Sequence, residues 1–103
     1  MVANRGWFDR VLACGWAYGG GKWFSNGAFL GKKGILCFTT GGGPGIYSED
    51  GLHGPPERLF YPIHHGVFNF TGIRALEPFV AHSASHVSEE KRKGYLDAWA
   101  NHL

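Results

Sequence analysis

A phenol and an imidazole follow a glycine-rich loop near the middle of the chain, and these side chains are well suited to chemistry. Tyr47 and His53 come soon after Thr39-Thr40-Gly41-Gly42-Gly43, which ends the apolar run 34–40. In open α/β sheets, ligands bind beyond the carboxyl ends of the strands. A phenol and an imidazole there could donate hydrogen bonds to a ligand that gains negative charge. The alternative is a plain tight turn with an exposed tyrosine and a surface histidine.

Other residue patterns that could carry chemistry are mostly excluded by their spacing. The glycine loop matches neither GxGxxG nor GxxxxGK[ST], so the sequence has neither the dinucleotide fingerprint nor the P-loop. His82 and His86 flank an expected strand end and helix start, which argues against a zinc pair. Cys37 lies inside an apolar run and is expected to be a small, buried hydrophobic residue.

The elements that lead to the glycine loop are predicted to be a helix, a long loop and a strand. Residues 3–14 predict a helix, because apolar residues recur at helical spacing from Trp7 to Leu12. Residues 15–31 predict a long loop, and loops of this length in compact domains are usually functional. Large aromatic side chains fill this loop: Trp16, Tyr18, Trp23, Phe24 and Phe29. The run 34–40 lacks alternation and predicts a strand covered on both faces, as in a parallel sheet.

Beyond the loop, the sequence predicts a helix, a second strand and a final helix. Pro55-Pro56 suits the start of a helix that continues to about Thr71. Residues 74–84 predict a strand, although Pro78 favours an edge position. Ser88 is expected to cap the last helix. Its buried stripe is expected to contain Tyr95, Leu96, Trp99 and Leu103. The order predicts an α/β fold with parallel strands, but two strands are too few for a complete sheet.

Length and composition bound the function classes. The chain has 103 residues and a net charge of +2, with 10 basic against 8 acidic side chains. This size fits one domain, and the even charge balance argues against nucleic-acid or membrane partners. No apolar run approaches a transmembrane span, and no signal-peptide pattern opens the chain. The 2 cysteines are too few for a disulfide framework, so we expect a cytosolic protein.

Several stretches of the chain, in order and at matching spacing, resemble one known family. It is the NAD(P)H:quinone oxidoreductases of the DT-diaphorase type, which are flavodoxin-like homodimers that carry FAD. The resemblance runs across essentially the whole chain, including Leu76-Glu77-Pro78 and Ala98-Trp99. The main matching stretches are Arg5-Gly-Trp-Phe-Asp-Arg-Val, Thr39-Thr-Gly-Gly, Ile46-Tyr-Ser-Glu-Asp-Gly-Leu-His-Gly54 and Tyr61-Pro-Ile-His-His-Gly-Val-Phe-Asn-Phe-Thr-Gly72.

The resemblance implies an FAD site and the residues that form it. Tyr47 and His53 match the catalytic pair that stabilises the reduced flavin during hydride transfer. Asp9 and Arg92 match residues at the adenine end of FAD. The residues that hold the isoalloxazine ring are matched by Thr39, Thr40, Gly41, Gly42 and Tyr47.

The resemblance also implies a quinone pocket that two subunits build together. Tyr18 and Phe70 match aromatic residues that the second subunit contributes, and Gly66 lies beside Phe70. Ile46 stands where the family often has methionine, and His53 lies on the substrate side as well. We therefore expect a homodimer whose contact includes the loop 16–29 and the helix 55–71.

The chain departs from the family pattern in ways that affect the expected function. The resemblance implies that the first three strands and the loop that binds the FAD phosphates belong to an N-terminal half not seen here. Gly20 replaces a second pocket tyrosine. Asn69 replaces a histidine of a metal site found in one member, which leaves His65 without its partner, so we predict no metal. We expect residues 1–103 to form the C-terminal portion of a three-layer flavodoxin-like α/β/α domain, with about two strands and three helices.

Three functions remain open. The first is two-electron reduction of quinones by NAD(P)H through FAD. The second is a non-catalytic fragment that acts only in dimerisation or protein interaction. The third is a small flavin- or nucleotide-binding module without reductase activity.

Overall fold

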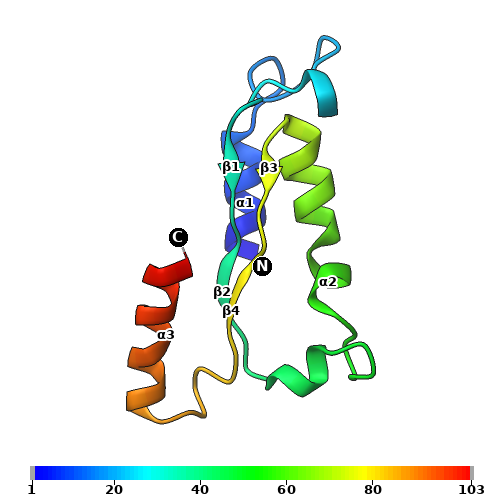
Figure 1. The fold of residues 1–103 in the computed structure, drawn as a ribbon. Coiled ribbons are helices and arrows are strands. Elements are labelled where there is room, and N and C mark those ends of the chain that lie inside the picture. Colours follow the sequence, from blue (N-terminus) through cyan, green and yellow to red (C-terminus); the bar gives the residue numbers. More distant parts are fainter. Residues whose placement is uncertain (1, 103) are drawn as a thin grey trace. The chain divides into compact units, whose positions relative to one another are not determined.

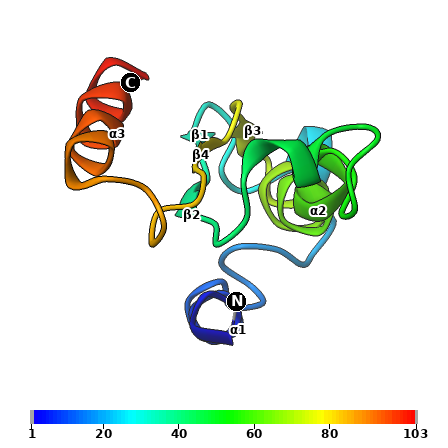
Figure 2. The same ribbon diagram turned by 90° about the horizontal axis from the view of Figure 1, so that it is seen from below.

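The computed structural model describes residues 2–102 (Figures 1 and 2). Contacts between residues divide the chain into two compact units. The first unit comprises residues 1–34 and 60–75, and the second comprises residues 35–59 and 76–103. Each unit contains one pair of short parallel strands and at least one helical segment. The parallel pairing confirms the predicted strand direction.

The first unit begins with helix α1, Val2–Val11, and contains the parallel strands β1, Lys33–Gly34, and β3, Arg74–Ala75. Lys33 pairs with Arg74, and Gly34 pairs with Ala75. Helix α1 ends earlier than predicted, shortly before Gly15, which adopts a φ of 91°. The long loop that follows contains a single 3₁₀ turn among the described residues, η1, Phe24–Asn26.

Two glycines let the long loop approach the end of the helical segment in the first unit. A Cβ built on Gly27 would lie 2.5 Å from the Cα of Gly72, so only glycine fits there. Gly72 itself has a φ of 92°, a left-handed conformation that favours glycine. The N–H of Phe29 donates to the Thr71 carbonyl across this crossing at 2.9 Å.

The predicted helix 55–71 is not a regular α-helix. Helix α2 covers Pro56–Ile63, and a π-helical segment, η3, covers His64–Asn69, with helical structure continuing to Thr71. Pro62 lies inside α2 and has no N–H to donate, which weakens the helical ladder just before η3. The predicted start and end are confirmed, but the widened turn between them was not predicted.

The second unit contains strands β2, Cys37–Thr39, and β4, Phe79–Ala81, and helix α3, Glu89–His102. The strands run parallel with Cys37 opposite Phe79 and Thr39 opposite Ala81. A 3₁₀ turn, η2, Pro44–Tyr47, follows the glycine loop. The Ser88 hydroxyl accepts the Lys91 N–H at 3.2 Å, so the predicted cap of α3 is confirmed.

Each of the two predicted strands is interrupted. The run 34–40 gives β1 and β2 with Ile35 and Leu36 between them, and the run 74–84 gives β3 and β4 with residues 76–78 between them. Pro78 lies in the second gap, where its missing N–H prevents ladder pairing. The strand segments are therefore shorter than the predicted runs.

Few side chains of the described residues are buried. The buried ones are Ala17, Ala81 and Thr71. Cys37 was predicted to be buried but is exposed, because β2 is not covered on both faces. Leu96 was predicted to be buried but is 70% exposed, while Tyr95 and Trp99 are half-buried; Leu103 lies outside the described residues.

Within residues 2–102, no helix is both long and apolar enough to cross a membrane.

Candidate functional site

The glycine loop lies at the carboxyl end of β2, as predicted, and hydrogen bonds from the segment after β4 hold it in place. The Thr40 N–H donates to the Ala81 carbonyl at 3.1 Å, and the Ala84 N–H donates to the Thr40 carbonyl at 3.2 Å. The Ser83 N–H donates to the Gly42 carbonyl at 3.1 Å. The Thr40 hydroxyl also donates to the Gly42 carbonyl, at 2.8 Å. These bonds fix residues 40–42 against a single partner segment.

Two consecutive backbone donors in this loop remain available for a ligand. Among the described residues, no acceptor receives the N–H of Gly41 or Gly42. A Cβ built on Gly41 would meet no atom within 4 Å, so space is open beside this residue. Gly42 is closed in by the Ile46 side chain instead. Unpaired amides beside open space, beyond a parallel strand, are suited to binding a polar ligand.

Three aromatic rings gather next to this loop. The Tyr47 ring centroid lies 5.5 Å from that of His53 and 5.6 Å from that of His82. The backbone N–H of His53 donates to the Ile46 carbonyl at 2.9 Å, which folds the segment 46–53 back on itself. Gly51 is needed at this fold, because a Cβ there would lie 2.5 Å from the Gly45 carbonyl oxygen. The loop therefore brings the predicted pair Tyr47 and His53 together.

His82 is a neighbour of the site that the sequence analysis did not include. It follows β4 directly, and Thr40 follows β2 directly. Because Thr39 pairs with Ala81 in parallel register, the next residues on the two strands lie side by side. His82 Nδ1 lies 3.3 Å from Thr40 Oγ1. The two predicted strands, if paired in parallel, would have placed His82 next to Thr40 and so identified it as a site residue.

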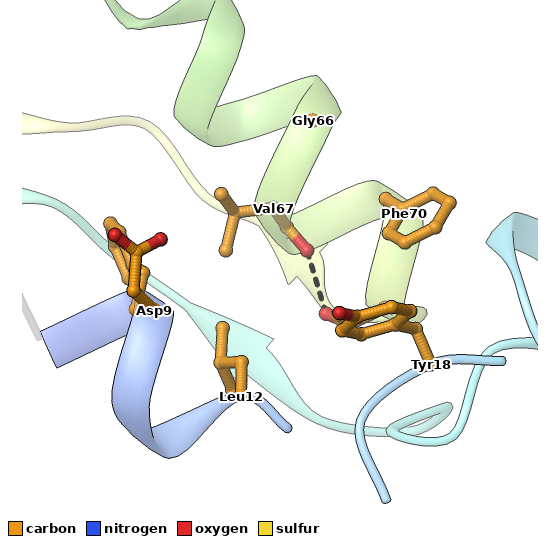
Figure 3. A pocket seen from close by; sticks show the side chains of 8 residues that line it. Asp9, Leu12, Tyr18, Gly66, Val67 and Phe70 are labelled. Carbon is orange, nitrogen blue, oxygen red and sulfur yellow. Dashed lines mark hydrogen bonds between the residues drawn. The ribbon is translucent and has the colours of Figure 1, made fainter. Parts of the chain in front are cut away.

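A pocket of about 240 Å³ lies in the first unit between α1, the long loop and η3 (Figure 3). Three of the predicted substrate residues, Tyr18, Gly66 and Phe70, line it together with Asp9. The Tyr18 and Phe70 ring centroids are 5.9 Å apart. Its remaining lining residues are Phe8, Leu12, Val67 and Thr71.

The floor of this pocket depends on the π-helical segment. The Thr71 hydroxyl donates to the carbonyls of Val67 at 2.7 Å and Phe68 at 3.0 Å, and the first of these bonds is drawn in Figure 3. Thr71 is 2% exposed, so its hydroxyl is satisfied inside the segment rather than by water. The segment thereby presents Gly66, Val67 and Phe70 to the pocket.

Further aromatic residues support Phe70 from the long loop. The Phe24 ring packs edge-on against Phe70 at 5.6 Å and also contacts His65 at 5.0 Å. His65 in turn stacks on Tyr61 at 4.9 Å with an angle of 8° between the planes. Phe24 has a φ of 47°, a left-handed conformation that costs a non-glycine residue energy. Its ring contacts offset part of that cost.

The two residues that match the family's residues at the adenine end of FAD lie in different units. Asp9 lines the pocket of the first unit, and its carboxylate lies 3.8 Å from the Arg5 guanidinium in an exposed ion pair. Arg92 belongs to the second unit, where its guanidinium donates to the carbonyls of Val87 at 2.7 Å and Ala84 at 3.4 Å. Arg92 therefore ties the turn before α3 to the helix.

No group of three or more potential metal ligands is gathered among residues 2–102.

Comparison with known proteins assigns the fold. A family profile described as "flavodoxin-like fold" matches residues 4–103. The chain belongs to this family. The predicted flavodoxin-like α/β fold is thereby confirmed, and so is the resemblance to the quinone oxidoreductases, as the similar proteins make clear.

Two curated relatives and one solved structure are similar to nearly the whole chain. NAD(P)H dehydrogenase [quinone] 1 of Rattus norvegicus is 37% identical over 96% of this chain, which spans 36% of the rat protein. Ribosyldihydronicotinamide dehydrogenase [quinone] of Homo sapiens is 35% identical over 96% of this chain, which spans 43% of the human protein. A Klebsiella pneumoniae protein assigned as a quinone reductase is 32% identical with a TM-score of 0.82, over 94% of this chain and 39% of that one. The chain thus spans less than half of these relatives.

Membership of this fold family implies a flavin cofactor, and the residues of the second unit fit one. A flavin ring is planar and carries hydrogen-bond acceptors on its edge. The unpaired N–H groups of Gly41 and Gly42, the open space beside Gly41, and the donors Tyr47 and His53 match these needs. Thr39 and Thr40 flank the same strand end.

Proposed function

We propose that this chain forms part of an FAD-dependent NAD(P)H dehydrogenase that reduces quinones by two electrons. The observation that carries the proposal is the grouping of Tyr47 and His53, 5.5 Å apart, beside the unpaired amides of Gly41 and Gly42. The two curated relatives are both named as quinone dehydrogenases, which supports the same reaction class. Overall, the quinone gains a hydride from NAD(P)H and a proton from solvent, giving a hydroquinone and NAD(P)⁺.

The chemistry of the reaction comes from the flavin, which when bound accepts a hydride from the nicotinamide and passes it to the quinone. The protein's part is to bind the ring and to stabilise charge. The N–H groups of Gly41 and Gly42 would bind the acceptor edge of the ring, held by the Thr40 hydroxyl bond to the Gly42 carbonyl at 2.8 Å. Tyr47 and His53 would donate hydrogen bonds where negative charge develops.

The pocket of the first unit is the proposed substrate side. Tyr18 and Phe70 place two aromatic rings at this pocket, with their centroids 5.9 Å apart, and an aromatic ring can stack on a planar quinone. Gly66 leaves open space on the η3 segment, since a Cβ there would meet no atom within 4 Å. In the proposed homodimer, Ile46 and His53 of one subunit would contact a quinone to which Tyr18 and Phe70 of the other subunit contribute. Asp9 and Arg92 are proposed to bind the adenine end of FAD, Arg92 through guanidinium N–H groups not used by Val87 and Ala84.

We further propose that the intact protein is a cytosolic homodimer in which the long loop and the helix 55–71 form the contact. The exposed aromatic side chains of this region support the proposal, because such surfaces are typical of interfaces. Trp16 is 57% exposed, Trp23 52% and Tyr61 59%.

A chimera tests the proposed reaction. This chain would replace the matching segment of the human relative, with which it is 35% identical. We expect the purified chimera to retain FAD and to oxidise NADH or NADPH when menadione is added. The chain alone, reconstituted with FAD, gives the companion measurement. A folded chimera that retains FAD but does not reduce menadione would contradict the proposal.

The second candidate is a non-catalytic fragment that acts in dimerisation or protein interaction. The observation that favours it is the large share of apolar surface left open: Trp7 is 55% exposed and Leu52 84%. Such surface drives association. Analytical ultracentrifugation of the chain alone with added FAD separates the candidates. Oligomers that bind no flavin would favour the second candidate, and a stable monomer that binds no flavin would contradict both.

A further inference from the structure

His82 lies directly after β4, and hydrogen bonds hold the backbone on both sides of it. Its carbonyl accepts the Tyr95 hydroxyl at 2.7 Å, which ties it to α3. Its neighbours Ser83 and Ala84 donate their N–H groups to the carbonyls of Gly42 and Thr40. The side chain is half-buried. The backbone around His82 is therefore the same frame that positions residues 40–42.

The hydrogen-bond distances around Thr40 favour one tautomer of His82. The Thr40 hydroxyl has one hydrogen, and it is donated to the Gly42 carbonyl at 2.8 Å. With the hydrogen in this shorter bond, the Thr40 oxygen accepts from His82 Nδ1, which lies 3.3 Å away. We therefore assign the hydrogen of the neutral His82 ring to Nδ1, which leaves the lone pair on Nε2.

The same imidazole also contacts the proposed catalytic tyrosine. The His82 and Tyr47 ring centroids are 5.6 Å apart, with 36° between the planes. His82 is thus connected to both proposed parts of the flavin site. It is linked to the loop amides by way of Thr40 and Gly42, and its ring packs against the phenol of Tyr47.

We propose that His82 is a positioning residue that acts through Thr40 and Tyr47. Its Nδ1–H donates to the Thr40 hydroxyl and fixes that hydroxyl on the Gly42 carbonyl. This bond holds the Gly41 and Gly42 amides toward the flavin, while the ring supports Tyr47. The flavin part of the inference rests on the proposed function; the hydrogen bond and its effect on the loop do not.

The first test measures the tautomer directly. Long-range ¹H–¹⁵N spectra of the full chain, assigned by comparison with His82→Asn, report which nitrogen of His82 is protonated. We expect the Nδ1–H form in the unmodified chain and its loss in Thr40→Val. A His82 ring in the Nε2–H form would overturn the proposal, whether or not the chain binds flavin.

The second test separates the hydrogen bond from the ring. In His82→Asn, the side-chain amide places a donor near the position of Nδ1, whereas His82→Phe keeps a ring without a donor. We expect hydrogen exchange at the Ser83 amide to accelerate roughly fivefold in His82→Phe, the effect of one typical hydrogen bond, and much less in His82→Asn. His86→Phe, an exposed histidine on the same turn, is the matched control.

A double variant shows whether His82 acts through Thr40. Because both changes remove the same bond, His82→Phe combined with Thr40→Val should accelerate Ser83 exchange no more than the larger single effect. Additive effects, or equal effects of His82→Phe and His86→Phe, would overturn the proposal. If a variant does not fold, the tautomer measured in the unmodified chain decides.

Flavin titration of the same variants tests the functional part. We expect His82→Phe to weaken FAD binding roughly fivefold, in line with the exchange effect, and His82→Asn to stay within about twofold. If the unmodified chain binds no flavin, the proposed function loses support, while the tautomer and exchange results still decide the role of His82. Equal FAD affinities of the unmodified chain and His82→Phe would overturn the positioning role.

Discussion

At the residue scale, the candidate site combines a pair that the sequence predicts with a neighbour that it does not. Tyr47 and His53 are separated by a short glycine-containing segment, so their proximity could be expected from local sequence and from the family resemblance. His82 is distant in sequence, and only the parallel register of Thr39 with Ala81 brings it to Thr40. Pairing between distant strands is not encoded in local spacing. The sequence therefore placed His82 at the end of a strand but gave it no role in the site.

Replacing His53 tests the charge-stabilising role. In the flavin-loaded chimera, His53→Gln should slow flavin reduction while leaving FAD bound, because it alters a donor without touching the glycine loop. Removing one well-placed donor typically costs about 2–4 kcal/mol of transition-state stabilisation. Stopped-flow absorbance gives the rate, with His86→Gln as the control. A rate equal to that of the unmodified chimera would indicate that His53 is only a surface histidine.

Removing the Thr71 hydroxyl tests the floor of the pocket. Thr71→Val keeps the side-chain shape but loses the bonds to the Val67 and Phe68 carbonyls at 2.7 and 3.0 Å. We expect a loss of about 1–2 kcal/mol in the free energy of unfolding, because the site is buried. Thr71→Ser, which keeps the hydroxyl, should lower the free energy of unfolding by less. Chemical denaturation measures both, and equal stability of Thr71→Val and the unmodified chain would contradict this role.

At the element scale, helices were predicted better than strands. Helix α3 and its Ser88 cap follow from local signals, and so do the limits of the helical stretch from Pro56 to Thr71. The strands were predicted as single runs, although Pro78 in the second run signals the interruption. The π-helical segment was not predicted, because a widened turn has no simple residue signature, even though Pro62 stands directly before it.

The crossing of Gly27 and Gly72 predicts a sharp difference between two glycine substitutions. Gly27→Ala places a methyl group 2.5 Å from backbone atoms of Gly72, so we expect destabilisation by about 1–3 kcal/mol. Gly6→Ala lies in α1 with no atom within 4 Å of the new methyl group, so it should stabilise by about 0.5–1 kcal/mol. Thermal denaturation followed by circular dichroism compares them. Similar melting temperatures for the two variants would show that the crossing is not closely packed in solution.

At the scale of the whole molecule, the fold family could be predicted, whereas burial could not. The run containing Cys37 was expected to be covered on both faces, yet Cys37 is exposed. Leu96 was expected in the buried stripe of the last helix, yet it is exposed as well. Apolar periodicity indicates which face of a helix or strand is suited to burial. It does not indicate whether another of the described residues packs on that face. The chain spans 36% to 43% of the curated relatives, so the rest of their length has no counterpart here.

The proposed homodimer predicts that the long loop controls association. In the chimera, Trp23→Ser should weaken the dimer, because the side chain is 52% exposed in the isolated chain and would be covered in the contact. Leu52→Ser is the matched control, since Leu52 is 84% exposed but lies outside the proposed contact. Light scattering across a dilution series measures the mass. A dimer equally tight in both variants would assign the contact to another surface.

The widened turn at His64–Asn69 also limits how this gene can change in length. A π-turn holds one residue more than an α-turn, so loss of one codon in this stretch could be absorbed by narrowing the turn. An inserted codon has no such outlet, because each further residue of a helix turns the chain by about 100° around the axis, which would rotate Phe70 away from Tyr18. Descendants that keep the pocket are therefore expected to tolerate a one-codon deletion here more readily than an insertion.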